Sequence, residues 1–73
     1  MSRIEARFSV SGMHCRSCSM MVDMTVTELA GVESSETDLP SGTTKVVFDD
    51  AVVSAEQIRV AIEAAGYPAT IGE

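Results

Sequence analysis

The sequence predicts an α+β fold in which strands and helices follow one another in the order β-α-β-β-α-β. Three observations lead to this prediction. Residues Arg3–Val10 alternate apolar with polar side chains, two later segments carry apolar residues at helical spacing, and glycines or turn residues separate the segments. Such an order packs as a four-stranded antiparallel sheet with both helices on one face. The length of 73 residues fits one domain, which we expect to span residues 1–73.

The first strand and the first helix are predicted within the first 31 residues. The alternation in Arg3–Val10 is typical of a half-buried strand, and Gly12 breaks it. Cys18–Leu29 is predicted as a helix that ends near Gly31, a residue free to take a positive φ. One apolar stripe runs along this helix, formed by Cys18, Val22, Val26 and Leu29.

The two middle strands differ in how clearly the sequence predicts them. Thr43–Phe48 is the clearest β segment by composition, and the Pro40–Gly42 turn precedes it. Residues 32–39 form a weak strand that we place at a sheet edge, where Glu33 and Glu36 discourage unwanted pairing. The residues of this strand expected to face inward are Val32, Ser35, Thr37 and Leu39.

The last helix and strand carry clear start and stop signals. Ser54 and Gln57 form a capping box, and Gly66 closes the helix. Apolar residues recur at helical spacing between them, at Ile58, Ala61, Ile62 and Ala65. Tyr67–Ile71 is predicted as a short final strand, and Pro68 suggests that this strand is also an edge.

Composition excludes several classes of function. A net charge of −6 with only five Lys and Arg residues argues against binding to nucleic acid or to anionic lipid. No apolar run approaches the roughly 18–20 residues of a membrane span, and the N-terminus shows no secretory leader. We therefore expect a cytoplasmic protein with reduced thiols. One histidine and no Gly-rich phosphate loop give no recognisable catalytic machinery, so we expect no enzyme.

The segment Gly12–Cys18, "GMHCRSC", is where reactive side chains gather. By the predicted elements, Cys15 lies in the loop after the first strand and Cys18 in the first helical turn. The positive end of the helix dipole and Arg16 both favour thiolates there. Two converging thiolates form a soft, two-coordinate site that suits Cu(I), whereas structural zinc normally takes four ligands.

Two other interpretations of the cysteine pair remain. A CxxC sequence at a helix start is also typical of thiol-disulfide oxidoreductases. Their scaffold is longer and mainly parallel near the motif, which this chain is too short to build. The second interpretation is a pair of cysteines without a role, which the strand-loop-helix context makes the weaker one.

The sequence resembles the heavy-metal-associated domain family, which includes small copper chaperones and N-terminal modules of copper-exporting P-type ATPases. The resemblance covers nearly the whole chain: "GMHCRSC" fits GMxCxxC, "AGV" follows the first helix, and "AIEAAGY" ends the second. It implies a ferredoxin-like βαββαβ sandwich and metal ligation by Cys15 and Cys18. His14 stands where threonine is commonest in the family, and the first helix is rich in methionine.

Roles are also expected for the residues around the cysteines. The resemblance implies that Met13 points inward and supports the loop rather than binding metal. His14 is expected in solvent, with metal ligation as the alternative, and Arg16 is expected to be exposed and to stabilise bound thiolates. Tyr67 either shields the sulfur atoms or serves as a core aromatic. Met20 and Met24 are expected to face away from the apolar stripe, as core filler or as a contact surface.

The expected function is therefore that of a Cu(I) metallochaperone that delivers copper to the metal-binding domain of a copper-transporting P-type ATPase by thiolate exchange. Three alternatives are a metal-binding domain cut from such an ATPase, a mercury-binding member of the family, and a thiol-disulfide oxidoreductase. We expect a monomer without metal and no direct membrane binding. The resemblance implies that a metal-bridged homodimer can form.

Overall fold

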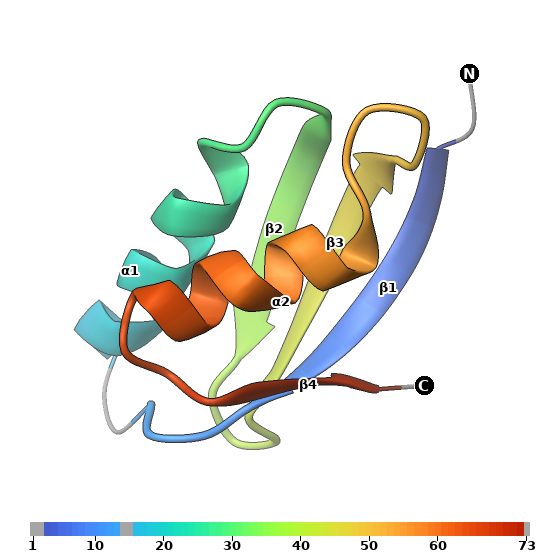
Figure 1. Ribbon diagram of the computed structural model, residues 1–73. Helices are drawn as coiled ribbons and strands as arrows, with labels where there is room; N and C mark the ends of the chain where they lie inside the picture. Colours follow the sequence, from blue (N-terminus) through green and yellow to red (C-terminus); the bar gives the residue numbers. More distant parts are fainter. Residues whose placement is uncertain (1–2, 14–15, 73) are drawn as a thin grey trace.

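The computed structural model describes residues 3–13 and 16–72, and its elements follow the predicted order (Figure 1). The strands are antiparallel and lie in the order β2-β3-β1-β4. Both helices lie on one face of this sheet (Figure 1), which confirms the ferredoxin-like prediction. The elements are β1 (Arg3–Val10), α1 (Arg16–Thr27), β2 (Val32–Asp38), β3 (Thr43–Asp49), α2 (Ala55–Ala64) and β4 (Ala69–Gly72).

The core lies between the sheet and the two helices. The strands predicted to be edges, β2 and β4, are the outer strands, and β1 and β3 are central. Phe8 on β1 is opposite Thr44 on β3, and both side chains are fully buried. Alternate residues of a strand point to the same face of the sheet, so the core combines residues of the sheet with residues of the helices. Its buried members are Phe8, Val10, Val22, Val26, Val46, Phe48, Val53, Ile58, Ile62 and Ala69.

Strand β2 contains a β-bulge that explains its irregular pattern. The residues predicted to face inward are the partly buried ones: Val32, Ser35, Thr37 and Leu39. The first two are three residues apart, which a regular strand would place on opposite faces. The register shifts between Val32 and Ser34, so Glu33 is the extra residue and alternation resumes on the correct face.

A polar layer joins α1 to the inner side of β2. The Asp23 carboxylate on α1 accepts hydrogen bonds from the hydroxyls of Ser35 and Thr37, each at 2.7 Å. The Thr37 and Thr44 hydroxyl oxygens lie 2.9 Å apart and form a further hydrogen bond. Among the described residues, no buried side-chain nitrogen or oxygen lacks a partner, so the low apolar content of β2 leaves no unsatisfied group.

The boundaries of α1 correct the prediction. The helix begins and ends two residues earlier than Cys18–Leu29. After Thr27 the bonding changes to a tighter turn, in which the Leu29 amide donates to the Val26 carbonyl at 3.1 Å. Gly31 follows with φ of +92°, and a Cβ atom there would lie 2.8 Å from the Cβ of Val52. Glycine is therefore required in this turn, but it does not end the helix itself.

The second helix is as predicted, and the final strand is shifted. Ser54 accepts from the Gln57 amide at 3.1 Å, and the Gln57 side chain accepts from the Ser54 amide at 2.9 Å, which confirms the capping box. Strand β4 runs from Ala69 to Gly72 instead of Tyr67–Ile71. Pro68 has no amide proton for the sheet, and its carbonyl accepts from Ser11 at 2.8 Å before regular pairing begins.

Candidate metal site

The loop that carries the cysteine motif leaves β1 at one end of the sheet and enters α1. Its first residues are anchored to two other parts of the chain. The Val10 amide donates to the Gly42 carbonyl in the β2–β3 turn, and the Ser11 amide donates to the Pro68 carbonyl, both at 2.8 Å. The start of the loop is thereby fixed to both neighbours of β1, while Gly12 takes a φ of +86°.

The structure describes one of the two predicted ligands. Cys18 is the third residue of α1 and is partly buried, so it lies in the first helical turn as predicted. Cys15 and His14 lie outside the described residues. Met13 is partly buried and packs against the core, which is the inward position that the resemblance implied.

Positive charge surrounds the start of α1. Arg16 is exposed and is the first residue of the helix, whose first turn contains no acidic residue. The N-terminus of a helix carries roughly half a positive charge from its unpaired amides. The Ser19 hydroxyl donates to the Arg16 carbonyl at 2.7 Å and steadies this turn. The helix dipole therefore favours an anionic group at this position, and no acidic residue of the first turn opposes it.

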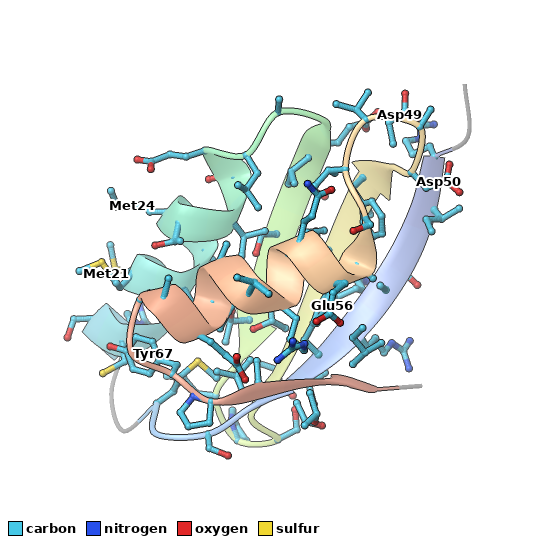
Figure 2. The ribbon with its side chains drawn as sticks, in the orientation of Figure 1. Met21, Met24, Asp49, Asp50, Glu56 and Tyr67 are labelled. Carbon is cyan, nitrogen blue, oxygen red and sulfur yellow. The ribbon has the colours of Figure 1, made fainter. Side chains whose placement is uncertain are left out.

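Tyr67 lies against the same loop from the other half of the chain. It follows α2, is partly buried and packs against the core. A Cβ atom on Gly12 would lie 3.7 Å from the Cδ1 atom of Tyr67, so ring and loop are in van der Waals range. Figure 2 shows Tyr67 at the end of the molecule where α1 begins. The two positions expected of Tyr67, beside the loop and against the core, are thus compatible.

The outward face of α1 carries three exposed methionines, whereas the sequence analysis expected two. Met20 and Met24 are exposed, as expected of residues facing away from the apolar stripe, and Met21 is exposed beside them. The expected contact surface included only Met20 and Met24. Its spacing could have placed Met21 on this surface, because residues three apart on a helix are neighbours and Met21 precedes Met24 by three.

Neither a cluster of metal-binding side chains nor a membrane-spanning helix is found in the described parts of the chain. Within residues 3–13 and 16–72, no three His, Cys, Asp or Glu side chains gather closely enough to hold a metal ion. Over the same residues, no helix combines the length and the apolar character that crossing a bilayer requires.

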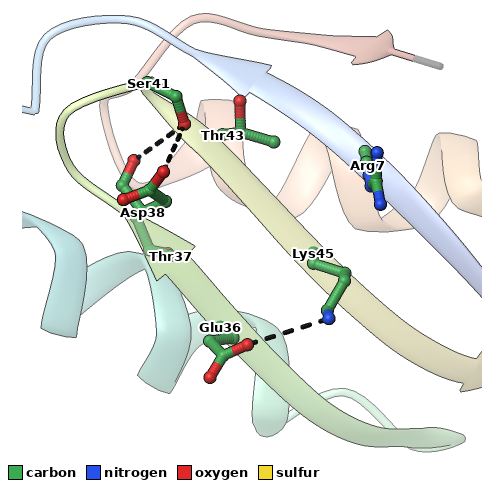
Figure 3. A pocket seen from close by; sticks show the side chains of 7 residues that line it. All are labelled: Arg7, Glu36, Thr37, Asp38, Ser41, Thr43 and Lys45. Carbon is green, nitrogen blue, oxygen red and sulfur yellow. Dashed lines mark hydrogen bonds and ion pairs between the residues drawn. The ribbon is translucent and has the colours of Figure 1, made fainter.

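A separate hollow lies on the face of the sheet that the helices leave open (Figure 3). Its polar groups largely satisfy one another: Lys45 lies 3.7 Å from Glu5 and 3.9 Å from Glu36, and the Ser41 hydroxyl donates to Asp38 at 2.9 Å. The residues that line the hollow are Arg7, Glu36, Thr37, Asp38, Ser41, Thr43 and Lys45. None of them belongs to the cysteine loop, so the hollow is a separate feature.

Comparison with known proteins decides the family. The sequence profile described as "Heavy-metal-associated domain" matches residues 7–68. The chain belongs to this family. This heavy-metal-associated domain is 43% identical over 58 residues to the copper chaperone CopZ of Staphylococcus saprophyticus, a match that covers 80% of this chain and 85% of that protein. It is 33% identical over 63 residues to human copper-transporting ATPase 2, covering 86% of this chain but 4% of the ATPase.

Solved structures agree with the family. The domain superimposes with a TM-score of 0.94 on a copper-binding domain from HMA7, a P-type ATPase, at 33% identity, covering 99% of this chain and 96% of the other. Oxidized MerP from Ralstonia metallidurans CH34 gives the same TM-score at 28% identity, covering 99% and 100% of the two chains. The domain thus shares its fold both with a copper-binding domain of a P-type ATPase and with MerP.

Proposed function

We propose that this domain binds one Cu(I) ion through Cys15 and Cys18 and passes it to the metal-binding domain of a copper-transporting P-type ATPase. The observation that carries the proposal is the place of Cys18, in the first turn of a helix whose start is positively charged and lacks acidic residues. The similarity to a copper chaperone over 85% of that protein's length supports the choice of copper and of a carrier.

The charge balance explains why the ligands suit this place. Cu(I) held by two thiolates carries a net charge of −1. The helix N-terminus and Arg16 offset that charge without adding a ligand, so the ion stays two-coordinate. Tyr67 covers one side of the loop and limits access of water, while Met13 supports it from the core. His14 stays in solvent in this proposal.

Transfer follows from the open coordination sphere. A cysteine thiolate of the partner enters as a third ligand, and one of the two domain sulfurs leaves. A second partner thiolate then enters, and the other domain sulfur leaves. Two copper–sulfur bonds form and two break, so the transfer needs no oxidant or reductant. Both thiols must be reduced, so the proposal places the domain, residues 1–73, in the cytoplasm as a monomer that a shared metal ion can link into a dimer.

The test is an anaerobic titration of the reduced protein with Cu(I) in competition with a chelator, with Zn(II) in parallel. We expect one Cu(I) per chain to be held against the chelator, in preference to zinc, and this chelator-resistant binding to be lost in the Cys15→Ser, Cys18→Ser double variant. The Arg16→Gln variant should retain the ion with lower affinity, because it keeps both sulfurs and loses only charge. Equal Cu(I) affinity in the parent and the double variant would overturn the ligand assignment.

A transfer experiment separates copper from mercury, the cargo of the mercury-binding family member considered as an alternative from the sequence. Two thiolates bind both soft ions, so affinity alone does not identify the cargo. The copper-loaded domain should transfer its ion to an isolated metal-binding domain of a copper-transporting ATPase, measured as metal content after the two are separated. Failure to transfer copper, with intact binding, would leave a binding domain and remove the carrier function.

A further inference from the structure

Three methionines form an exposed cluster on α1, and the proposed function does not use them. The exposed fractions of Met20, Met21 and Met24 are 56%, 52% and 58%. The opposite face of the helix is the buried one, carrying Ser19, Val22 and Val26. Figure 2 shows Met21 and Met24 projecting from the same side of α1, away from α2. Their thioether sulfurs are thus accessible from solvent.

The spacing of the three residues suits a chelate. Met20 and Met24 are four residues apart, and Met21 and Met24 are three apart, so each pair sits on neighbouring helical turns with Cβ atoms about 5–6 Å apart. The same four-residue spacing places two histidines on one zinc ion in helical metal sites. Methionine has three rotatable side-chain bonds, so the sulfur atoms can converge on one ion without a change in the helix.

The chemistry of the cluster selects a soft monovalent cation. Thioether sulfur is a soft ligand that favours Cu(I) over zinc, calcium or magnesium. It carries no charge, so it binds Cu(I) more weakly than a thiolate does. It also loses no proton on binding, whereas thiolate binding requires deprotonation. The net charge of −6 raises the local concentration of cations around the domain.

We propose that Met20, Met21 and Met24 form a second binding site for a soft monovalent cation, Cu(I) or its redox-stable analogue Ag(I), on the outward face of α1. The site goes beyond the proposed function and does not depend on the cysteine pair. Met21 lies three residues after Cys18, so the site begins one helical turn from that sulfur.

The experiment uses the Cys15→Ser, Cys18→Ser variant, in which the thiolate site is removed. The protein carries 13C-labelled methionine methyl groups and is titrated with Ag(I) in chloride-free buffer at about pH 5. We expect one Ag(I) per chain and shifts of the methyl signals of Met20, Met21 and Met24. The signal of Met13, which packs against the core, should not move. Binding should be unchanged between about pH 5 and pH 7, because thioethers do not titrate.

The matched control adds Met20→Leu, Met21→Leu and Met24→Leu to the same background. Leucine keeps the apolar surface and the helix propensity but removes the sulfur, so the fold should persist and Ag(I) affinity should fall at least tenfold. Met24→Leu alone, which removes the residue shared by both close pairs, should weaken binding with even less effect on folding. Unchanged Ag(I) affinity in the leucine variants, or methyl shifts confined to Met13, would overturn the proposal.

The outcomes separate this site from the cysteine site and from a protein-docking surface. Absence of chelator-resistant Cu(I) binding in the parent, with Ag(I) binding retained in the cysteine-free variant, would count against the proposed function alone. An apolar docking surface would tolerate leucine and leave Ag(I) unbound. Absence of Ag(I) binding in the cysteine-free variant would therefore exclude the thioether site, whatever the cysteines bind.

Discussion

The two helices lie on the same face of the sheet and are built in different ways. Helix α2 follows the local rules of helix stability: it has a capping box at Ser54, an acidic residue in its first turn, and two fully buried isoleucines. Helix α1 has no acidic residue in its first turn and no basic residue in its last turn. It contacts β2 through the polar Asp23 and exposes three methionines.

Stability and the proposed metal chemistry are divided between the two helices of this small domain. An acidic first turn would stabilise α1 as a helix, but it would also weaken an anionic metal–thiolate group at the same place. Helix α2 has no such conflict, since its N-terminus lies outside the cysteine loop. We therefore expect α2 to contribute more of the folding free energy and α1 to tolerate changes that leave its sulfur atoms intact.

The largest expected effect is on the core face of α2. Ile62→Ala removes three carbon atoms from a fully buried position and should lower the free energy of unfolding by about 2–5 kcal/mol. On α1, Val22→Ala removes two carbon atoms from an equally buried position and should cost less. Chemical denaturation of each variant gives the two values. A greater loss for Val22→Ala would contradict the assignment of stability to α2.

Val60→Ala is the control for this measurement. Val60 lies on α2 but is 49% exposed, so its replacement should change the free energy of unfolding by less than about 0.5 kcal/mol. A large loss at Val60 would mean that the helix itself, and not its buried face, is sensitive to alanine.

The next effect concerns the polar contact between α1 and β2. Asp23→Ala removes the acceptor of two hydroxyl groups and should lower the free energy of unfolding by about 1.5–3 kcal/mol, the range for hydrogen bonds to a charged group. Asp23→Asn keeps one oxygen acceptor and should cost less. The measurement is again chemical denaturation, with Asp50→Ala, at an exposed position, as the control.

A second variant distinguishes the network from simple packing. Adding Ser35→Ala, Thr37→Val and Thr44→Val to Asp23→Ala replaces the whole set of partners, including the fully buried Thr44, with apolar groups. Much of the lost stability should return, because no hydroxyl of the polar layer is then left without a partner. If this quadruple variant is less stable than Asp23→Ala alone, the polar layer contributes more to stability than the pairing of its own polar groups.

The sequence predicted most of this fold because the strongest signals are local. Alternation in β1, the capping box of α2 and the apolar spacing around Ile58 and Ile62 each depend on a few neighbouring residues. The polar layer could not be predicted, since it joins Asp23 to Ser35 and Thr37, which are 12 and 14 residues away along the chain. The inward-facing serine and threonine were visible in the sequence, but their acceptor was not.

The candidate site likewise combines a local feature that the sequence predicts with a long-range contact that no local pattern predicts. The place of Cys18 in the first helical turn follows from the motif and the start of the apolar stripe. The approach of Tyr67 to Gly12 depends on how β4 and the loop after α2 pack beside β1, a contact between opposite ends of the chain. Only the resemblance to the family pointed to it, because no local pattern connects positions 12 and 67.

The smallest expected effect is on the outward face of α2, where ion pairs stand in place of the thioethers of α1. Arg59 binds the carboxylates of Glu56 and Glu63 at positions three residues before and four residues after it. The hydrogen bond from Arg59, together with its charge, lowers the pKa of Glu56 below the ordinary value of 4.5. Glu56 is exposed and Arg59 is only partly buried, so salt screens the interaction and its contribution to stability is modest.

The pH dependence follows from the sign of this shift. Since the pKa of Glu56 is lower in the folded state, its contribution is fully present above about pH 4.5 and is lost as the pH falls through the lowered value. The melting temperature of Arg59→Gln should therefore lie below that of the parent at neutral pH, and the pH-dependent part of the difference should vanish in acid. Any packing lost with the Arg59 stem is independent of pH and remains.

Carboxyl NMR titration of Glu56 should give a higher pKa in Arg59→Gln than in the parent, with Arg3→Gln as a control that leaves it unchanged. A Glu56 pKa that does not respond to Arg59→Gln would mean that the outward face of α2 is as free of stabilising charge contacts as that of α1, and the contrast between the helices would then be confined to their buried faces.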